Sequence, residues 1–172
     1  MLFSLDKEKP VRIKRIKRAM KVGERAPLYS LLSDSRSAYI LADELGNGPV
    51  LMLFFPAAFT GTCTSELNEV SNDIESYAPA SVVGISTDTP FALAEYSRQN
   101  GFRMPLLSDH DATVSSQYDT KYEDGSFLKM DRISKRSAFV VDKQGIIQYA
   151  EVLDHAGDVP DLMAIKSLIS TL

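Results

Sequence analysis

The stretch FFPAAFTGTCTSE, residues 54–66, joins two segments with different hydrophobic patterns. Before it, residues 49–55 form a continuous apolar run, which is typical of a central strand buried on both faces. After it, apolar residues follow helical spacing as far as Ile74. The stretch also holds Cys63, the only cysteine of the chain. The sequence therefore predicts a strand, a loop and a helix, with a single thiol in the first turn of the helix.

Strands and helices alternate along the rest of the sequence. Further strands are expected at residues 28–32, 38–41, 81–86, 105–108, 138–142 and 146–151, and further helices at 90–100, at 111–118 and from 158 onward. The first two strands are separated by turn residues and predict an N-terminal β-hairpin. This order indicates an α/β fold, a three-layer sandwich around a central mixed β-sheet.

Charge divides the chain into two parts. Residues 1–21 hold eight Lys or Arg against two acidic residues, a net charge of +6, so the remainder carries −10 of the total of −4. We expect a basic N-terminal extension at residues 1–19 and a single domain at residues 20–172. The acidic domain argues against nucleic acid as its partner, because phosphate binding needs clustered positive charge.

The basic extension allows several interpretations. Ile13, Ile16 and Met20 lie at helical spacing among basic residues, a pattern that could contact anionic lipid or nucleic acid. A flexible solvated tail, or a start of translation at Met20, is the simpler explanation. No apolar run reaches the roughly 18 residues of a membrane span, and the first 20 residues lack the apolar core of a secretory signal. We expect a cytoplasmic protein whose residues 20–172 bind no membrane.

The single cysteine also limits the possible metal and redox sites. It excludes a disulfide within the chain and a zinc site built from several cysteines. The two histidines, His110 and His155, lie in polar surroundings and are expected at the surface. We therefore expect neither a metal nor a cofactor.

The predicted position of Cys63 favours its reactive form. Free backbone N–H groups and the positive end of the helix dipole meet in the first turn of a helix, where they stabilise an anion. An ordinary thiol is already a few per cent ionised at pH 7, so full ionisation gains only about 30-fold in rate. A fast thiol enzyme must therefore also stabilise its transition state. The hydroxyl of Thr60 or Thr62 could cap the helix or face the sulfur, and a capping or solvent-facing position is the simpler interpretation for Thr62 and Thr64.

The pattern Pro56-x-x-x-Thr60-x-x-Cys63 resembles the active-site motif of the peroxiredoxins, thiol peroxidases with a thioredoxin-like fold. The resemblance begins near Met20 and extends to the final helix. The segments PLLSD and RSAFVVD, at residues 105–109 and 136–142, make the chain most similar to the one-cysteine alkyl hydroperoxide reductase E type.

This resemblance implies a peroxidase that reduces hydrogen peroxide and organic hydroperoxides. It makes Cys63 the nucleophile that is oxidised to a sulfenic acid. Thr60 would hydrogen-bond the thiolate and the peroxide, and Arg136 would lie over both. Pro56 would shield the sulfur from water, and Glu66 would orient the arginine.

The resemblance also implies a one-cysteine mechanism. Glu66 stands where thioredoxins have their second cysteine, and Asn68 stands where one peroxiredoxin subgroup has a resolving cysteine. The sulfenic acid would then be reduced by an external thiol or by a thioredoxin- or glutaredoxin-like protein. A homodimer is also implied by the family.

Other interpretations stay open at this point. The chain could be a thiol redox sensor or a thioredoxin-like binding module that forms mixed disulfides at Cys63. Glu66 could be only a carboxylate favoured by a helix start. If Arg136 is not the active-site arginine, Arg103 and Arg132 are the next candidates. Phe59 could line the peroxide pocket or a dimer interface. Three other aromatic residues are expected in the core: Phe54, Phe55 and Tyr96.

Overall fold

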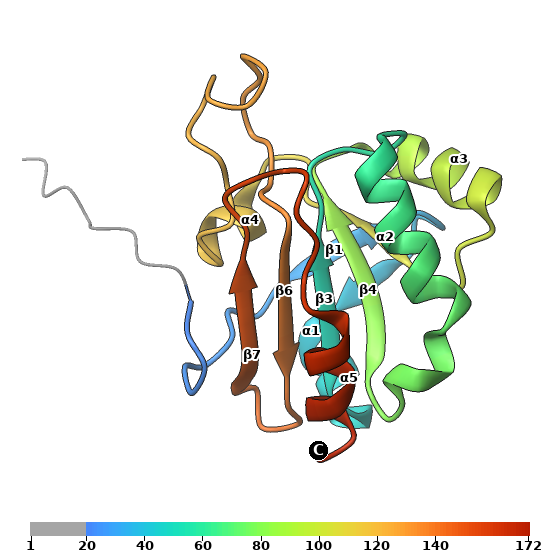
Figure 1. The fold of residues 1–172 in the computed structure, drawn as a ribbon, viewed down its shortest axis with the longest axis vertical. Helices are drawn as coiled ribbons and strands as arrows, with labels where there is room; N and C mark the ends of the chain where they lie inside the picture. Colours follow the sequence, from blue (N-terminus) through green and yellow to red (C-terminus); the bar gives the residue numbers. More distant parts are fainter. Residues whose placement is uncertain (1–19) are drawn as a thin grey trace, which may run out of the picture.

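The computed structural model describes residues 20–172, which form one mixed sheet covered by helices (Figure 1). The strands are β1 Ser30–Ser33, β2 Ala38–Ile40, β3 Val50–Phe54, β4 Ser81–Ser86, β5 Leu106–Ser108, β6 Ser137–Val141 and β7 Ile147–Val152. The helices are α1 Leu41–Asn47, α2 Gly61–Asn72, the 3-10 helix η1 Ile74–Tyr77, α3 Pro90–Asn100, α4 Thr113–Gln117 and α5 Leu162–Ile169. The expectations for residues 1–19 lie outside the described residues.

The sheet has the strand order β2-β1-β5-β4-β3-β6-β7. Strands β3, β4 and β5 are parallel neighbours, whereas β6 pairs antiparallel with β3 and β1 pairs antiparallel with β5. The predicted N-terminal hairpin is confirmed as β1 and β2, and it extends the sheet at one edge. The predicted mixed sheet is therefore confirmed.

The central strand β3 divides the core between the two faces of the sheet. Leu51, Leu53 and Phe55 pack against α2, α3 and α5 on one face. Met52 and Phe54 belong to the other cluster, which includes side chains from α1 and α4. All five residues of β3 are buried, as the continuous apolar run predicts. Helices on both faces of the sheet give the three layers of the predicted sandwich.

Several helices differ from the sequence-based expectation: α5 begins at Leu162 and not at 158, and α2 ends at Asn72, before the separate 3-10 helix η1. The sequence did not predict α1, in which Leu41 and Leu45 are buried one turn apart. Leu41 falls in the expected strand at 38–41, and the residues after it are mostly polar, so no helical pattern is visible. The expected helix at 111–118 is shorter at its start, since the Asp109 carboxylate accepts the backbone N–H groups of Val114 and Ser115. Local side-chain capping therefore fixes this helix start.

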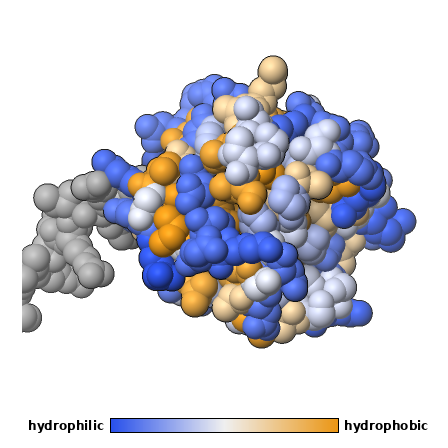
Figure 2. Space-filling model, turned by 90° about the horizontal axis from the view of Figure 1, so that it is seen from below, coloured by the Kyte–Doolittle hydropathy of each residue, from blue (hydrophilic) through white to orange (hydrophobic). Residues whose placement is uncertain are grey.

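The carboxyl end of β3 and the amino end of α2 meet at the upper end of the molecule in Figure 1, to the right of the protruding loop that precedes β6. Hydrophilic and hydrophobic residues are interspersed on the opposite end, which is seen from below in Figure 2. Within residues 20–172, no helix is long and apolar enough to cross a membrane. The features relevant to chemistry thus lie at one end of the sheet.

Candidate active site

Cys63 lies in the first turn of α2, as predicted, and is 2% exposed. The loop from Phe55 to Thr60 turns the chain from β3 into this helix, and Phe59 adopts a left-handed backbone conformation with φ of 63°. Thr60 stands at the position before the helix, with an extended backbone. The sharp turn therefore places the sulfur at the carboxyl end of the central strand.

Arg136 is brought to the sulfur by the pairing of β6 with β3. Ser137, the first residue of β6, pairs with Phe54, the last residue of β3, so Arg136 falls beside the active-site loop. Its Nη2 donates a hydrogen bond to Cys63 Sγ at 3.2 Å and another to the carbonyl oxygen of Ala156 at 3.1 Å. Arg136 is 1% exposed. A buried cation is thus fixed against the thiol.

Glu66 binds the other terminal nitrogen of this arginine. Its carboxylate accepts from Arg136 Nη1, and both side chains are buried. Glu66 lies three residues after Cys63 in α2, so both side chains project from neighbouring positions on one face of the helix. The helix therefore presents a thiol and a carboxylate to a single guanidinium group.

Burial and charge act in opposite directions on this pair. Burial raises the pKa of Glu66 to about 7, although Arg136 works against this rise. Burial by itself would lower the pKa of Arg136, but the negative charges of Glu66 and Cys63 outweigh burial and raise it. The arginine therefore stays charged at physiological pH, and its charge is directed at the sulfur.

Thr60 has a different partner from the predicted one. Its hydroxyl donates to the carbonyl oxygen of Ala57 at 2.9 Å, and no hydrogen bond joins it to Cys63 among the described residues. It makes no side-chain capping bond either. Its bond to the thiolate stays a prediction, and it would require the side chain to turn.

Thr64 is neither a cap nor merely solvent-facing. Its hydroxyl donates to the carbonyl oxygen of Thr60 at 2.7 Å and lies 2.9 Å from the hydroxyl of Tyr96. Thr64 has only one hydroxyl proton, so Tyr96 must be the donor in the second bond. This chain of bonds links α3 to Thr60, the residue directly before α2.

A cavity of about 300 Å³ opens onto Cys63. Pro56 is buried and lines it together with Thr60 and Thr62. Arg136 and the segment 156–157 form a second side. Phe127, Leu128 and Met130 form a third side, and they come from the protruding loop between α4 and β6. The cavity therefore combines a buried free thiol, a cation and an apolar side.

The model of the "AhpC/TSA family" matches residues 22–150, most of the chain. The chain belongs to this family. The AhpC/TSA chain is 35% identical over 147 residues to "Alkyl hydroperoxide reductase E" of Mycobacterium tuberculosis, covering 83% of this chain and 91% of that protein. It is 30% identical to "Thiol peroxidase" of Bacillus subtilis, covering 87% and 89% of the two chains.

Solved structures agree with this family assignment. The crystal structure of peroxidoxin BcpB from Mycobacterium tuberculosis has a TM-score of 0.79 at 28% identity, with 89% of this chain and 98% of that chain covered. A peroxiredoxin-like protein from Aquifex aeolicus has a TM-score of 0.80 at 19% identity, with 91% and 90% covered, and supports the fold. The predicted thioredoxin-like peroxiredoxin fold is confirmed, and the AhpC/TSA chain is an antioxidant enzyme of the thiol peroxidase class that acts on peroxide.

The geometry of this AhpC/TSA protein distinguishes among the candidate arginines and histidines. Arg103 pairs with Glu75 at the surface, and Arg132 is exposed, so neither takes the place of Arg136. His110 and His155 are exposed, which confirms the prediction for both. In residues 20–172, no group of three or more His, Cys, Asp or Glu is arranged to hold a metal ion.

The aromatic residues of the AhpC/TSA site are mostly in the core. Phe54, Phe55 and Tyr96 are fully buried, as predicted. Phe59 is 54% exposed and does not line the cavity; its ring lies 5.0 Å from that of Tyr96. Phe59 therefore does not line the pocket, and its place in a dimer interface stays a prediction.

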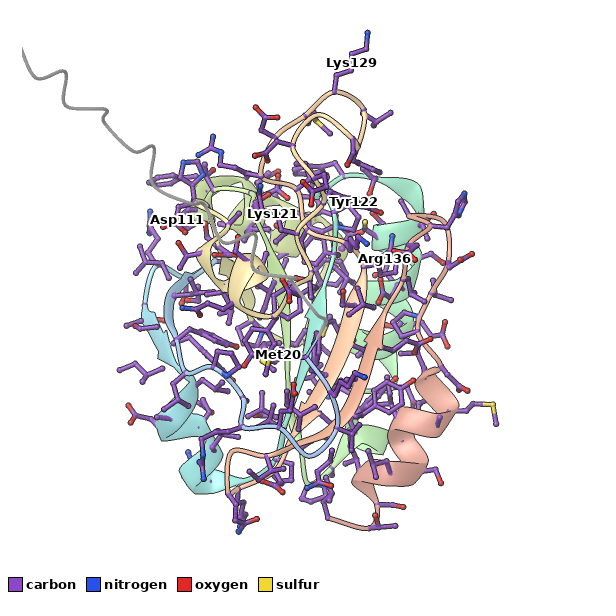
Figure 3. All side chains as sticks on the ribbon, turned by 90° about the vertical axis from the view of Figure 1, so that its left-hand side faces the viewer. Met20, Asp111, Lys121, Tyr122, Lys129 and Arg136 are labelled. Carbon is purple, nitrogen blue, oxygen red and sulfur yellow. The ribbon has the colours of Figure 1, made fainter. Side chains whose placement is uncertain are left out.

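The apolar side of the cavity was missed by sequence reasoning. Residues 119–135 lie between an expected helix and an expected strand and have no periodic apolar pattern. The signal was present in the group Phe127-Leu128-Lys129-Met130, which gathers three large apolar residues within a mostly polar segment. Figure 3 shows Lys129 at the tip of this loop and Tyr122 at its base, toward Arg136.

Proposed function

We propose that this peroxiredoxin reduces hydrogen peroxide and organic hydroperoxides by a one-cysteine mechanism. The observation that carries the proposal is the contact of 3.2 Å between Arg136 Nη2 and Cys63 Sγ, made while Arg136 is also bound to Glu66. A guanidinium group fixed in this way stabilises a thiolate and the charge that develops when a peroxide is attacked.

The first half of the reaction consumes one peroxide. The Cys63 thiolate attacks one peroxide oxygen, an S–O bond forms, and the O–O bond breaks. Hydroxide or alkoxide leaves and takes a proton to become water or an alcohol, and the sulfur is oxidised to a sulfenic acid. Arg136 would stabilise the leaving oxygen, and Thr60 would turn from Ala57 to hydrogen-bond the peroxide. Pro56, buried at the edge of the cavity, would limit the access of water.

The second half of the reaction needs thiols from outside the chain. An external thiol attacks the Cys63 sulfenic acid, releases water and forms a mixed disulfide. A second thiol then attacks this disulfide, restores the Cys63 thiol and leaves as the oxidised reductant. The presence of one cysteine in the whole sequence supports this route. The reductant would be a small thiol or a thioredoxin- or glutaredoxin-like protein.

The enzyme would act as a homodimer. Phe59 and Phe91 are 54% and 68% exposed, an unusual degree for phenylalanine. A partner that covers such side chains gains hydrophobic burial. Measurement of the mass in solution by sedimentation would test this assembly, and a monomer at micromolar concentration would contradict it.

The reaction is tested with one equivalent of peroxide. The reduced protein should lose its single thiol within seconds and form a sulfenic acid at Cys63 that dimedone traps. Cys63→Ser is the control that should consume no peroxide. A folded protein that keeps its thiol after seconds would contradict the proposal. Repeated turnover with a small thiol separates the enzyme from a redox sensor, which would stop after one oxidation.

A further inference from the structure

Three apolar side chains stand at the mouth of the Cys63 cavity: Phe127, Leu128 and Met130, here called the apolar wall. Leu128 is 77% exposed and Met130 is 38% exposed. The exposure of large apolar side chains such as Leu128 and Met130 to water is unfavourable. Their position beside Cys63 therefore calls for a function in binding.

The loop that carries the apolar wall is held in shape by its own contacts. The backbone N–H of Gly125 donates to the carbonyl oxygen of Met130 at 3.0 Å. The backbone N–H of Met130 donates to the carbonyl oxygen of Phe127 at 2.9 Å. The ring of Phe127 stacks on Tyr122 with a centroid distance of 5.0 Å and an interplanar angle of 17°. The wall is thus a built surface and not an open coil.

The backbone of the loop supports the same conclusion. Leu128 and Lys129 have φ of 49° and 57°, in the left-handed region that non-glycine residues rarely adopt. Two such residues in sequence persist only where surrounding contacts determine them. The Asp124 carboxylate supplies further contacts, because it pairs with Lys121 and accepts the backbone N–H of Arg132 at 3.1 Å. The loop therefore holds Leu128 at the cavity in spite of its unfavourable conformation.

We propose that the apolar wall determines substrate specificity by binding the apolar substituent of an organic hydroperoxide. This inference rests on the proposed function. The cavity has Arg136 and Cys63 at its base and the wall at its mouth, which matches a molecule with one peroxide end and one apolar end. The substrate would thus enter with its peroxide group toward Arg136.

Size supports an organic substituent over hydrogen peroxide alone. The cavity volume is about 300 Å³, whereas one water takes about 30 Å³ of the liquid, so a molecule as small as hydrogen peroxide would leave most of the cavity filled with water. An apolar substituent displaces that water from Leu128 and Met130. This binding energy, gained away from the reacting oxygens, helps to hold the peroxide in position for attack.

The test compares cumene hydroperoxide with hydrogen peroxide. The second-order rate of thiol loss is measured for each in single turnover, and the ratio of the two rates is compared between variants. The double variant Leu128→Asn, Met130→Gln makes the wall polar. Asparagine is among the residues that tolerate positive φ, so the loop conformation is kept. Lys129→Asn is the matched control, since Lys129 has the same backbone conformation but does not line the cavity.

We expect the double variant to lower the ratio about tenfold, the discrimination that a few apolar contacts supply. Lys129→Asn should leave the ratio within about twofold of the wild type by the same reasoning. An unchanged ratio in the folded double variant would overturn the inference. Slower reduction by the thiol, with an unchanged ratio, would also overturn it, because the wall would then serve the reductant. Absence of thiol loss with both peroxides in the wild type would instead contradict the proposed function.

Discussion

Arg136 Nη2 lies 3.2 Å from Cys63 Sγ, although the two residues are 73 positions apart in the chain. The antiparallel pairing of Ser137 with Phe54 brings them together. Because Arg136 is buried, its position is fixed before a peroxide arrives. Preorganised charge of this kind costs no rearrangement during the reaction, which is the condition under which electrostatic stabilisation is most effective.

Arg136→Met should slow the loss of the Cys63 thiol by roughly 100-fold or more, the usual effect of removing a donor to a developing charge. Thiolate formation alone can account for only about 30-fold. The measurement is the second-order rate constant for thiol loss with hydrogen peroxide at a series of pH values. A rate that recovers fully at high pH would mean that the arginine only promotes ionisation of the Cys63 thiol. Such recovery would contradict the prediction.

The control for Arg136→Met must remove the buried carboxylate as well. Without the arginine, Glu66 is buried unpaired, and this alone can unfold the protein. The double variant Glu66→Gln, Arg136→Met carries neither charge and should fold, as measured by circular dichroism, while keeping the slow rate. Arg103→Met, which removes a surface arginine, should keep the wild-type rate.

Glu66 should make stability depend on pH. Its pKa is about 7 in the folded protein against an ordinary value of 4.5, because burial disfavours the charge. Between these values the folded state binds more protons than the unfolded state, so the free energy of unfolding falls as pH rises. Relative to Glu66→Gln, the wild type should lose roughly 3 kcal/mol between pH 4.5 and pH 7.

Urea denaturation of both proteins at a series of pH values measures this difference. The change should be complete about one pH unit above the folded pKa of about 7, since Glu66 is ionised in both states beyond that point. A wild type that instead gains stability with pH relative to Glu66→Gln would mean that the ion pair with Arg136 dominates over burial.

The sequence specified the strands and the reactive loop because both have strong local patterns. The apolar run of β3 and the change to helical spacing after Cys63 are local properties, and the segment RSAFVVD placed Arg136 directly before the strand β6. The short helix α1 was missed because its two buried leucines follow a strand directly and leave no room for a turn signal. Long-range contacts, such as that between Arg136 and Ala156, leave no periodic pattern in the chain.

The missed apolar wall and the position of the Thr60 hydroxyl have a different explanation. Whether an apolar residue in a loop faces a cavity depends on the path of that loop. Here the path includes residues with a left-handed backbone conformation, which cannot be predicted from their residue types. The Thr60 hydroxyl donates to the carbonyl oxygen of Ala57 because the geometry of the turn brings these two groups together. Neither feature follows from residue type and spacing.

Thr60→Val should lower the rate of peroxide reduction by roughly 100-fold, because it removes a hydroxyl donor to the reacting oxygens. Thr60→Ser keeps the hydroxyl and should stay within about tenfold of the wild type. Thr60 is exposed, so neither change should alter the free energy of unfolding by more than about 1 kcal/mol. Equal rates for the Val and Ser variants would mean that the hydroxyl serves only the turn through Ala57.

Tyr96→Phe should loosen the start of α2. The Tyr96 hydroxyl donates to Thr64, which in turn donates to the carbonyl oxygen of Thr60 at 2.7 Å. Burial raises the pKa of Tyr96 to about 12, so the hydroxyl stays a donor at physiological pH. Its loss leaves Thr64 without one partner and should reduce the free energy of unfolding by about 1 kcal/mol.

Thr64→Val in the Tyr96→Phe background separates the hydrogen bond from ring packing. The ring of Tyr96 lies 5.1 Å from that of Phe102, and this packing is kept in the phenylalanine variant. If the two hydroxyls act through one bond, the double variant should be destabilised by less than the sum of the two single variants, measured in one double-mutant cycle. Strictly additive effects would show that Tyr96 does not act on the α2 start through Thr64. A coupling between them would identify α3 as a support for the turn that presents Cys63.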